Sequence, residues 1–138
     1  MKLLLSSLPN ASYPDYITMQ LQNPFALDEQ GIDNGELDGI RLEYILEYVQ
    51  FPKINEAIKY FLSKVKLGGE FSIKFVDFPS AHSLYMQDLD LDILNRNCGG
   101  KTLLTMEVVR DIMRGVGCDI RRADNIGAVY IIEGTRVS

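Results

Sequence analysis

The stretch that decides the fold is PKINEAIKYFLSKVKLGGEFSIKFVDF, residues 52–78, because it joins a clear helix pattern to a clear strand pattern. Pro52 suits the first helical turn, where its missing N–H costs nothing. We expect Gly68 and Gly69 to end the helix, since glycine readily takes the left-handed backbone of a close turn. Apolar residues recur at helical spacing and then at strand spacing: Ile54, Ala57, Ile58, Phe61, Leu62 and Val65, then Phe71, Ile73 and Phe75. The stretch therefore predicts a helix packed on a strand of an α/β sheet.

The segments on either side extend this pattern to the whole chain. Buried or alternating runs predict strands at 3–5, 16–22 and 38–42, helices at 81–97 and 105–117, and two strands joined by a turn over 118–134. Thr105 is a suitable N-cap for the second clear helix. We expect one domain, residues 1–138, with a Rossmann-like, mostly parallel sheet whose last strand runs antiparallel.

Composition limits the partners and the chemistry. The formal net charge of -5 disfavours nucleic acid, and we interpret Lys59, Lys64 and Lys66 as a solvated helix face. A single histidine excludes the usual histidine-rich metal sites, so no metal is expected. Cys98 and Cys118 show no paired spacing, which favours a reduced intracellular protein.

The N-terminal run MKLLLSS is too short for a secretory signal, because only three leucines precede Ser6. No apolar run approaches the roughly 20 residues of a membrane span. We therefore expect a cytoplasmic protein with no membrane contact. The run Gly100–Thr102 echoes a phosphate-binding loop, but Asn95 stands where that motif needs its first glycine. An unrelated nucleotide-binding domain is disfavoured for that reason.

Four short motifs occur in a characteristic order along the chain. They are LEY at 46–48, VKLGG at 65–69, VDF at 76–78 and GVGC at 115–118. With the strands before and between them, they resemble the class I S-adenosylmethionine-dependent methyltransferases, and most of all the compact bacterial and phage kind. The resemblance implies the strand order 3-2-1-4-5-7-6 with strand 7 antiparallel, here shortened around the third strand. It also implies S-adenosylmethionine as the cofactor.

The chain departs from that family where the cofactor is held. The family's glycine-rich turn after the first strand falls on Ser6, Ser7 and Leu8, whose side chains are expected to crowd the cofactor. The acid that binds the ribose diol falls on Gln20, and a neutral amide makes a weaker hydrogen bond than a carboxylate. The resemblance thus comes with a degenerate cofactor motif.

The resemblance also assigns candidate residues farther along the chain. Leu42 and Glu43, at the end of the fourth family strand, join Ser6, Ser7 and Gln20 as candidate cofactor contacts. No catalytic residue is marked by its context; Glu43 and Asp77 are the candidates for a general base. A solvated carboxylate or a helix cap is the simpler interpretation of both.

Two functions stay open at this point. The first is a pseudoenzyme, a methyltransferase-like scaffold with lost or weakened catalysis. The short first turn leaves no room for the usual next helix, so one sheet face should be thinly covered and available to a second copy or a protein partner. Its contact residues would be Tyr13, Tyr16, Ile17, Met19 and Phe25, although these also suit a core. The alternative is an active small methyltransferase of unknown acceptor.

Overall fold

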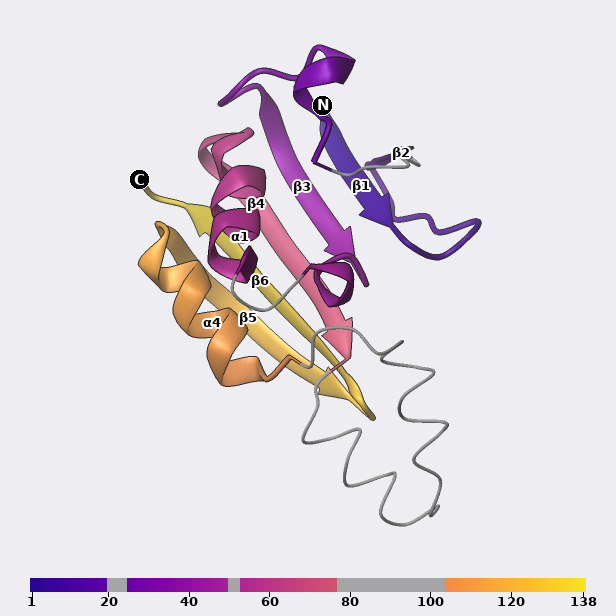
Figure 1. Ribbon diagram of the computed structural model, residues 1–138, viewed down its shortest axis with the longest axis vertical. Helices are drawn as coiled ribbons and strands as arrows, with labels where there is room; N and C mark the ends of the chain where they lie inside the picture. Colours follow the sequence, from indigo (N-terminus) through magenta and orange to yellow (C-terminus); the bar gives the residue numbers. More distant parts are fainter. Residues whose placement is uncertain (20–24, 50–52, 77–103) are drawn as a thin grey trace.

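The computed structural model describes residues 1–19, 25–49, 53–76 and 104–138. The described elements form one sheet with helices beside it (Figure 1). The strands are β1 (Lys2–Ser6), β2 (Ile17–Met19), β3 (Leu37–Glu43), β4 (Val65–Val76), β5 (Cys118–Ile126) and β6 (Val129–Arg136). The helices are α1 (Ile54–Ser63) and α4 (Met106–Gly115), with 3₁₀ turns η1 (Asp28–Gln30) and η2 (Leu46–Tyr48).

The strand order across the sheet is β2-β1-β3-β4-β6-β5. β1 runs parallel to β2 and β3, and β3 runs parallel to β4. β6 is antiparallel to both β4 and β5, so the predicted terminal hairpin and antiparallel last strand are confirmed. This order matches the expected family order without its third strand, since no described residue forms a strand beyond β2. The predicted fold class, a shortened methyltransferase-like sheet, is confirmed.

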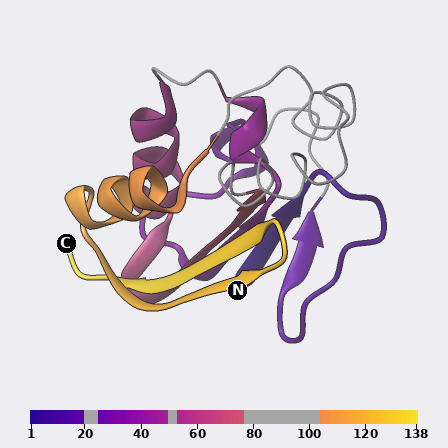
Figure 2. The same cartoon turned by 90° about the horizontal axis from the view of Figure 1, so that it is seen from below.

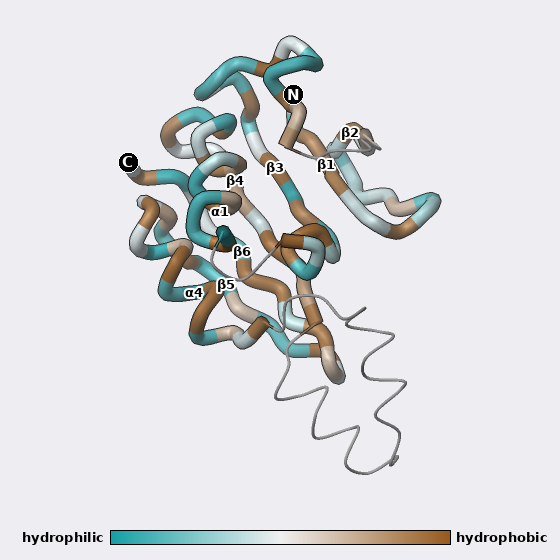
Figure 3. The backbone as a smooth tube through the Cα atoms, in the orientation of Figure 1, coloured by the Kyte–Doolittle hydropathy of each residue, from teal (hydrophilic) through white to brown (hydrophobic). Residues whose placement is uncertain are grey.

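Both α-helices lie on one face of the sheet, as Figure 2 shows. Each contributes an apolar stripe, and hydrophobic and hydrophilic residues alternate along α4 in Figure 3. The Thr105 side chain accepts a hydrogen bond from the Val108 N–H and caps α4 as predicted. The core between the helices and the sheet contains Leu3, Leu5, Ile40, Leu42, Ile58, Phe61, Phe71, Ile73, Phe75, Val109 and Met113. Neither described helix is long and apolar enough to cross a membrane.

The prediction that Gly68 and Gly69 end the helix is wrong. α1 already ends at Ser63, and both glycines lie inside β4. The end of α1 is held instead by Arg136, whose Nη1 donates to the carbonyls of Ser63 (3.2 Å) and Val65 (2.6 Å). The Ser63 carbonyl, at the end of α1, also accepts a hydrogen bond from the Gly35 N–H at 2.8 Å, and Val65 is the first residue of β4.

The two glycines form an irregular bend in β4. Between the pairs Leu37–Val65 and Gly39–Glu70, β3 advances two residues while β4 advances five. Gly68 takes up the bend in the left-handed conformation, φ +79°. A Cβ at Gly69 would lie 2.5 Å from Val65 Cγ1, so no side chain fits there. Glycine is thus required at both positions, but to bend a strand.

The interpretation of Lys64 as part of a solvated face is also wrong, because only 1% of this residue is exposed. Its Nζ forms an ion pair with Asp28 and donates to the Ile32 carbonyl at 3.2 Å. The ammonium also lies 5.2 Å from the centre of the Tyr60 ring. Lys64 follows the end of α1 and turns under the segment around η1, so it anchors the connection between β2 and β3. Lys59 remains exposed, as predicted.

Candidate functional site

The candidate site lies where the carboxyl ends of the parallel strands meet. β1 lies between β2 and β3. The chain therefore passes from β1 to β2 on one side and then crosses to β3 on the other side, so the order of strands reverses at β1. In open α/β sheets such a reversal leaves a crevice outside the strand ends where ligands bind. Here the last paired residues of the two strands are Ser6 and Glu43. The sheet thus brings together Ser6, Ser7, Leu42 and Glu43, as the resemblance predicts.

The turn after β1 is closed by its own hydrogen bonds. The Ser7 N–H donates to the Glu43 carbonyl at 3.2 Å, which continues the pairing of the two strands beyond Ser6. The Ser6 hydroxyl accepts from the Leu8 N–H at 3.1 Å. Leu8 is 48% exposed, so its side chain is not packed into the core at this point. The donors that a cofactor-binding turn would offer are therefore engaged within the protein.

The end of β3 separates its two candidate residues onto opposite sides of the sheet. Leu42 is fully buried in the core on the helix side. Glu43 faces the other side, where its Oε1 lies 3.0 Å from Arg41 Nε. The Glu43 carboxylate is therefore engaged by a guanidinium on the side of the sheet opposite the helices. Gln20 and Asp77 lie outside the described residues, so their predicted roles stay predictions.

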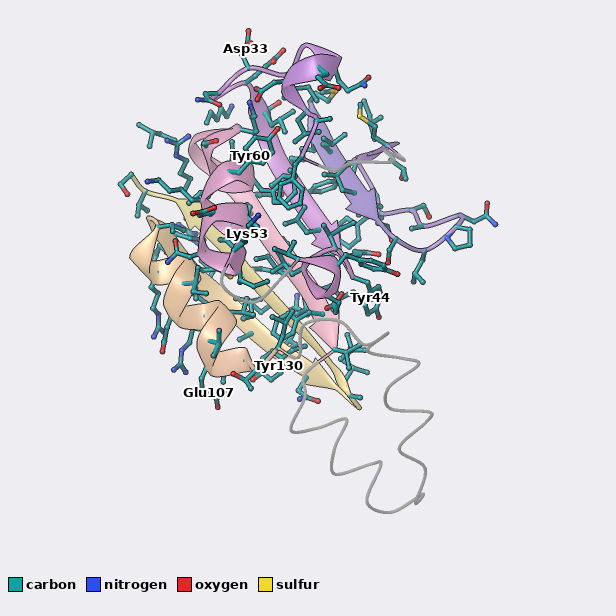
Figure 4. All side chains as sticks on the ribbon, viewed as in Figure 1. Asp33, Tyr44, Lys53, Tyr60, Glu107 and Tyr130 are labelled. Carbon is teal, nitrogen blue, oxygen red and sulfur yellow. The ribbon has the colours of Figure 1, made fainter. Side chains whose placement is uncertain are left out.

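Tyr44 follows Glu43 at the same edge (Figure 4) and was missed by sequence reasoning. Its backbone is left-handed, φ +57°, which is uncommon for a residue with a bulky side chain. The Tyr44 N–H donates to the Lys74 carbonyl at 2.9 Å. Partial burial raises the pKa of its phenol, and the charges of Glu43 and Glu47 raise it further. Tyr44 therefore presents a protonated hydroxyl near the strand ends, and no sequence pattern marks such a backbone.

Glu47, the acid of the LEY motif, fixes the architecture of this edge. It is buried in η2, and its Oε1 accepts a hydrogen bond from the Val76 N–H at 3.2 Å. That bond ties the segment after β3 to the last residue of β4. Hydrogen bonds to a charged group are worth more than neutral ones, so Glu47 holds the edge in shape.

The sheet face opposite the helices is covered by tyrosines of the connection between β1 and β2. The Tyr13 ring lies 4.0 Å from the guanidinium carbon of Arg41, and the two tyrosine rings meet edge to face at 5.3 Å. The Tyr16 hydroxyl donates to Glu70 at 2.8 Å. Neither of the two described α-helices lies on this face (Figure 2).

A chain of ion pairs crosses the same face from β3 to β5. Arg41 joins Glu43 to Glu133 (3.4 Å), and Arg122 joins Glu133 (3.9 Å) to Asp124. Opposite charges alternate along the whole chain, so each carboxylate has a cation beside it. This part of the open face is thus a row of paired charges with one more carboxylate than cations, and the candidate base Glu43 is its first member.

The five predicted contact residues separate onto different surfaces. Tyr13 and Tyr16 lie over the open face. Phe25 instead packs on α1, with ring centres 5.8 Å from Tyr60 and 5.3 Å from Phe61. Ile17 stands on the outermost strand and is 55% exposed, whereas Met19 packs partly against the core. Among these residues, Ile17 offers the largest exposed aliphatic surface.

We expect Tyr16→Phe to lower the free energy of unfolding by about 0.5–1 kcal/mol at neutral pH, since it removes a hydrogen bond to a half-exposed carboxylate. The Tyr16 hydrogen bond lowers the pKa of Glu70 in the folded state. The stabilisation is therefore present above the ordinary Glu pKa and is lost as pH falls through the folded value. Urea denaturation from pH 7 to pH 3 should show the difference between wild type and variant narrowing.

Tyr13→Phe is the matched control, because the Tyr13 ring contacts Arg41 but no hydrogen bond of its hydroxyl is found. It should stay within about 0.3 kcal/mol of wild type across the same pH range. A Tyr16→Phe difference that grows on acidification would contradict the role given to Glu70.

Metal ligands and a reactive thiol find no support in the described residues. No group of three or more His, Cys, Asp or Glu side chains among them is placed to hold a metal ion. Cys118 is a free, buried cysteine, and burial raises the pKa of its thiol to about 11. A thiol in that state is a weak nucleophile at neutral pH.

No protein-family model matches the chain, and no curated protein matches it either. Solved structures do match. An O-methyltransferase family protein from Burkholderia thailandensis is 20% identical with a TM-score of 0.64, over 88% of this chain and 36% of that one. Magnesium protoporphyrin IX methyltransferase from Synechocystis, with bound S-adenosylhomocysteine, is 13% identical with a TM-score of 0.59, over 86% of this chain and 51% of that one.

A further match is a chain of the complex between the Haloferax volcanii Trm112 methyltransferase activator and a methyltransferase. It is 13% identical with a TM-score of 0.62, over 93% of this chain and 64% of that one. The chain thus spans about a third to two thirds of the length of these three structures. Together they show that it has the fold of S-adenosylmethionine-dependent methyltransferases.

Proposed function

We propose that this chain is a methyltransferase-fold protein with lost or weakened catalysis that acts through protein contacts. The observation that carries the proposal is that polar groups at the ends of β1 and β3 are bonded within the protein. There the Ser7 N–H is bonded to the Glu43 carbonyl, and the Glu43 carboxylate is paired with Arg41. A ligand entering at this point would have to break bonds that the protein makes with itself.

The residue types support the same conclusion. Glycine lets a backbone approach a ligand closely, and the turn after β1 carries Ser6 and Ser7 instead. Gln20 stands where the family has an acid, and replacing a charged acceptor by a neutral one costs on the order of 1 kcal/mol. That energy alone is roughly a fivefold to tenfold loss of affinity. The fold-forming features, in contrast, are intact: the apolar stripes of α1 and α4 and the terminal hairpin.

Calorimetric titration with S-adenosylmethionine and S-adenosylhomocysteine tests the proposal. We expect no saturable heat up to about 1 mM of either compound, which corresponds to less than about 4 kcal/mol of binding free energy. A dissociation constant below about 100 µM for either compound would overturn it. Gln20→Asp is the matched variant: it restores the acid alone, and we expect at most about tenfold tighter binding than wild type.

An active methyltransferase is the second candidate, and one observation favours it. The edge that holds Ser6 and Glu43 also carries Tyr44, whose strained backbone and protonated hydroxyl are typical of functional sites. Methyl transfer from a sulfonium needs mainly positioning of the two reactants. Saturable binding of S-adenosylmethionine that Tyr44→Phe weakens would favour this candidate.

Protein contact is the remaining part of the proposal. Its support is the sheet face without a helix and the exposed apolar side chain of Ile17. The matching Haloferax volcanii complex shows that partnership occurs in another protein with this fold.

A further inference from the structure

The two outer strands of the sheet differ in how well they are protected against pairing with another chain. β5 carries a bulge between Ile120 and Arg122, and its outward residues include several charges. Bulges and charged side chains are the usual means by which proteins block an open strand edge. β5 is therefore a protected edge.

β2 has none of these protections. Its residues are Ile17, Thr18 and Met19, without a charge, a proline or a bulge. On its outer side it pairs with no described strand, and the Ile17 side chain is 55% exposed. An uncharged edge strand with an exposed aliphatic side chain is a template for a further strand.

The order of residues in β2 is self-complementary. Ile17 and Met19 are paired with Leu3 and Leu5, which belong to the core, so both point to the helix side of the sheet. Thr18 between them points to the open face. A twofold axis through Thr18 would place Ile17 opposite Met19 of the partner subunit, twice, and Thr18 opposite itself. Apolar pairs and threonine pairs of this kind stabilise antiparallel strands, and no like charges meet.

We propose that two copies of this chain associate through antiparallel pairing of their β2 strands, which makes one continuous sheet. The proposal names the partner for the protein contacts proposed above and rests on that function. β2 is fixed in position before association, since it pairs with β1, Met19 packs against the core, and the Thr18 hydroxyl donates to the Ala11 carbonyl at 3.1 Å. Such preorganisation lowers the entropy cost of binding.

A second copy fits this edge better than a charged partner does. The chain carries a net charge of -5, so two copies repel each other at long range. β2 is an uncharged stretch at which such chains can meet without placing like charges in contact. A partner selected by charge would find none on the three residues that β2 offers.

Sedimentation equilibrium of the full chain over a range of concentrations tests the proposal. We expect a dimer for wild type and at least a tenfold larger dimer dissociation constant for both lysine variants. Thr18→Lys sets two lysines opposite each other, and Ile17→Lys sets a lysine opposite Met19 of the partner subunit, twice. Ile126→Lys is the matched control: Ile126 is 69% exposed at the hairpin of β5 and β6, away from β2, and its variant should dimerise like wild type.

Circular dichroism identifies a variant that fails to fold, and Thr18→Lys then replaces Ile17→Lys as the decisive variant. A wild-type monomer at about 100 µM, or a dimer that both lysine variants leave intact, would overturn the proposal. The titration with S-adenosylmethionine is independent of this result. If the protein is a monomer and binds no cofactor, only the dimer proposal is overturned. If it is a dimer and binds the cofactor tightly, only the proposed loss of catalysis is overturned.

Discussion

Replacing Arg41 by methionine should lower the free energy of unfolding by about 3–5 kcal/mol. Arg41 is only 5% exposed, and it joins Glu43 at 3.0 Å to Glu133 at 3.4 Å. Its guanidinium also lies against the Tyr13 ring. Without it, the buried Glu43 carboxylate loses its cation, and an unpaired buried charge is strongly destabilising. Urea denaturation at neutral pH measures the loss.

The double variant Arg41→Met with Glu43→Leu is the control for this interpretation. Removing both charges leaves no uncompensated carboxylate, so the double variant should recover at least half of the loss of the single one. If the double variant loses as much stability as Arg41→Met or more, Arg41 acts through packing alone. The ion pair with Arg41 would then not be the interaction that engages the Glu43 carboxylate at the candidate site.

Gly134→Ala should lower the free energy of unfolding by about 3 kcal/mol, because the sheet has no room for a side chain there. Gly134 lies in β6 opposite Ile120 of β5. A Cβ at this position would lie 2.5 Å from the Asp119 carbonyl oxygen and 2.6 Å from Cys118 Sγ. The first of these is backbone and cannot rotate away, so β5 must shift. Thermal and urea unfolding both report the change.

Gly115→Ala is the matched control, at the last residue of α4. A Cβ there would meet nothing within 4 Å, and the backbone is not left-handed. Alanine is favoured over glycine in a helix, so this variant should gain about 0.5 kcal/mol. A Gly134→Ala variant as stable as wild type would show that β5 and β6 separate easily. The hairpin would then be a weaker part of the sheet than its close packing indicates.

These expectations bear on how a methyltransferase fold persists around an altered cofactor turn. The packing of α1 and α4 on the sheet involves neither Ser6 nor Ser7. At the ends of β1 and β3, one main-chain hydrogen bond joins Ser7 to Glu43, and one ion pair joins Glu43 to Arg41. The turn at Ser6 and Ser7 can therefore change with little effect on the packing of the fold, whereas the Arg41–Glu43 pair contributes to stability.

The chain itself identifies most elements of the fold. The spacing of Ile54, Ile58 and Phe61 marks the buried face of α1, and the alternation of Phe71 and Ile73 marks the core side of β4. Such patterns are local, because period 3.6 and period 2 each follow from the backbone geometry of a single element. The strands after α4 and their turn are predicted by the same means.

The ends of the helices and the burial of single polar residues depend on contacts with residues that are distant in the sequence. At the end of α1, the Ser63 carbonyl accepts hydrogen bonds from Arg136, more than 70 residues away in the chain, and from the Gly35 N–H. Lys64 is buried because Asp28 and Ile32 supply partners for its ammonium. From the local pattern a lysine is predicted to be exposed, because its charge prefers water. Lys64 is buried only because a segment distant in the sequence packs against it.

The sequence by itself determined a methyltransferase-like order of strands and helices, and it places serines in the turn after the first strand. The tertiary structure alone decided that Glu43 is held by Arg41 and that Tyr13 and Tyr16 lie over the sheet face opposite the helices. It also placed β2 at the edge of the sheet that the described strands form. Hydrophobic periodicity is written in neighbouring residues, whereas ion pairs, stacked rings and open edges arise between residues that only the folded sheet brings together.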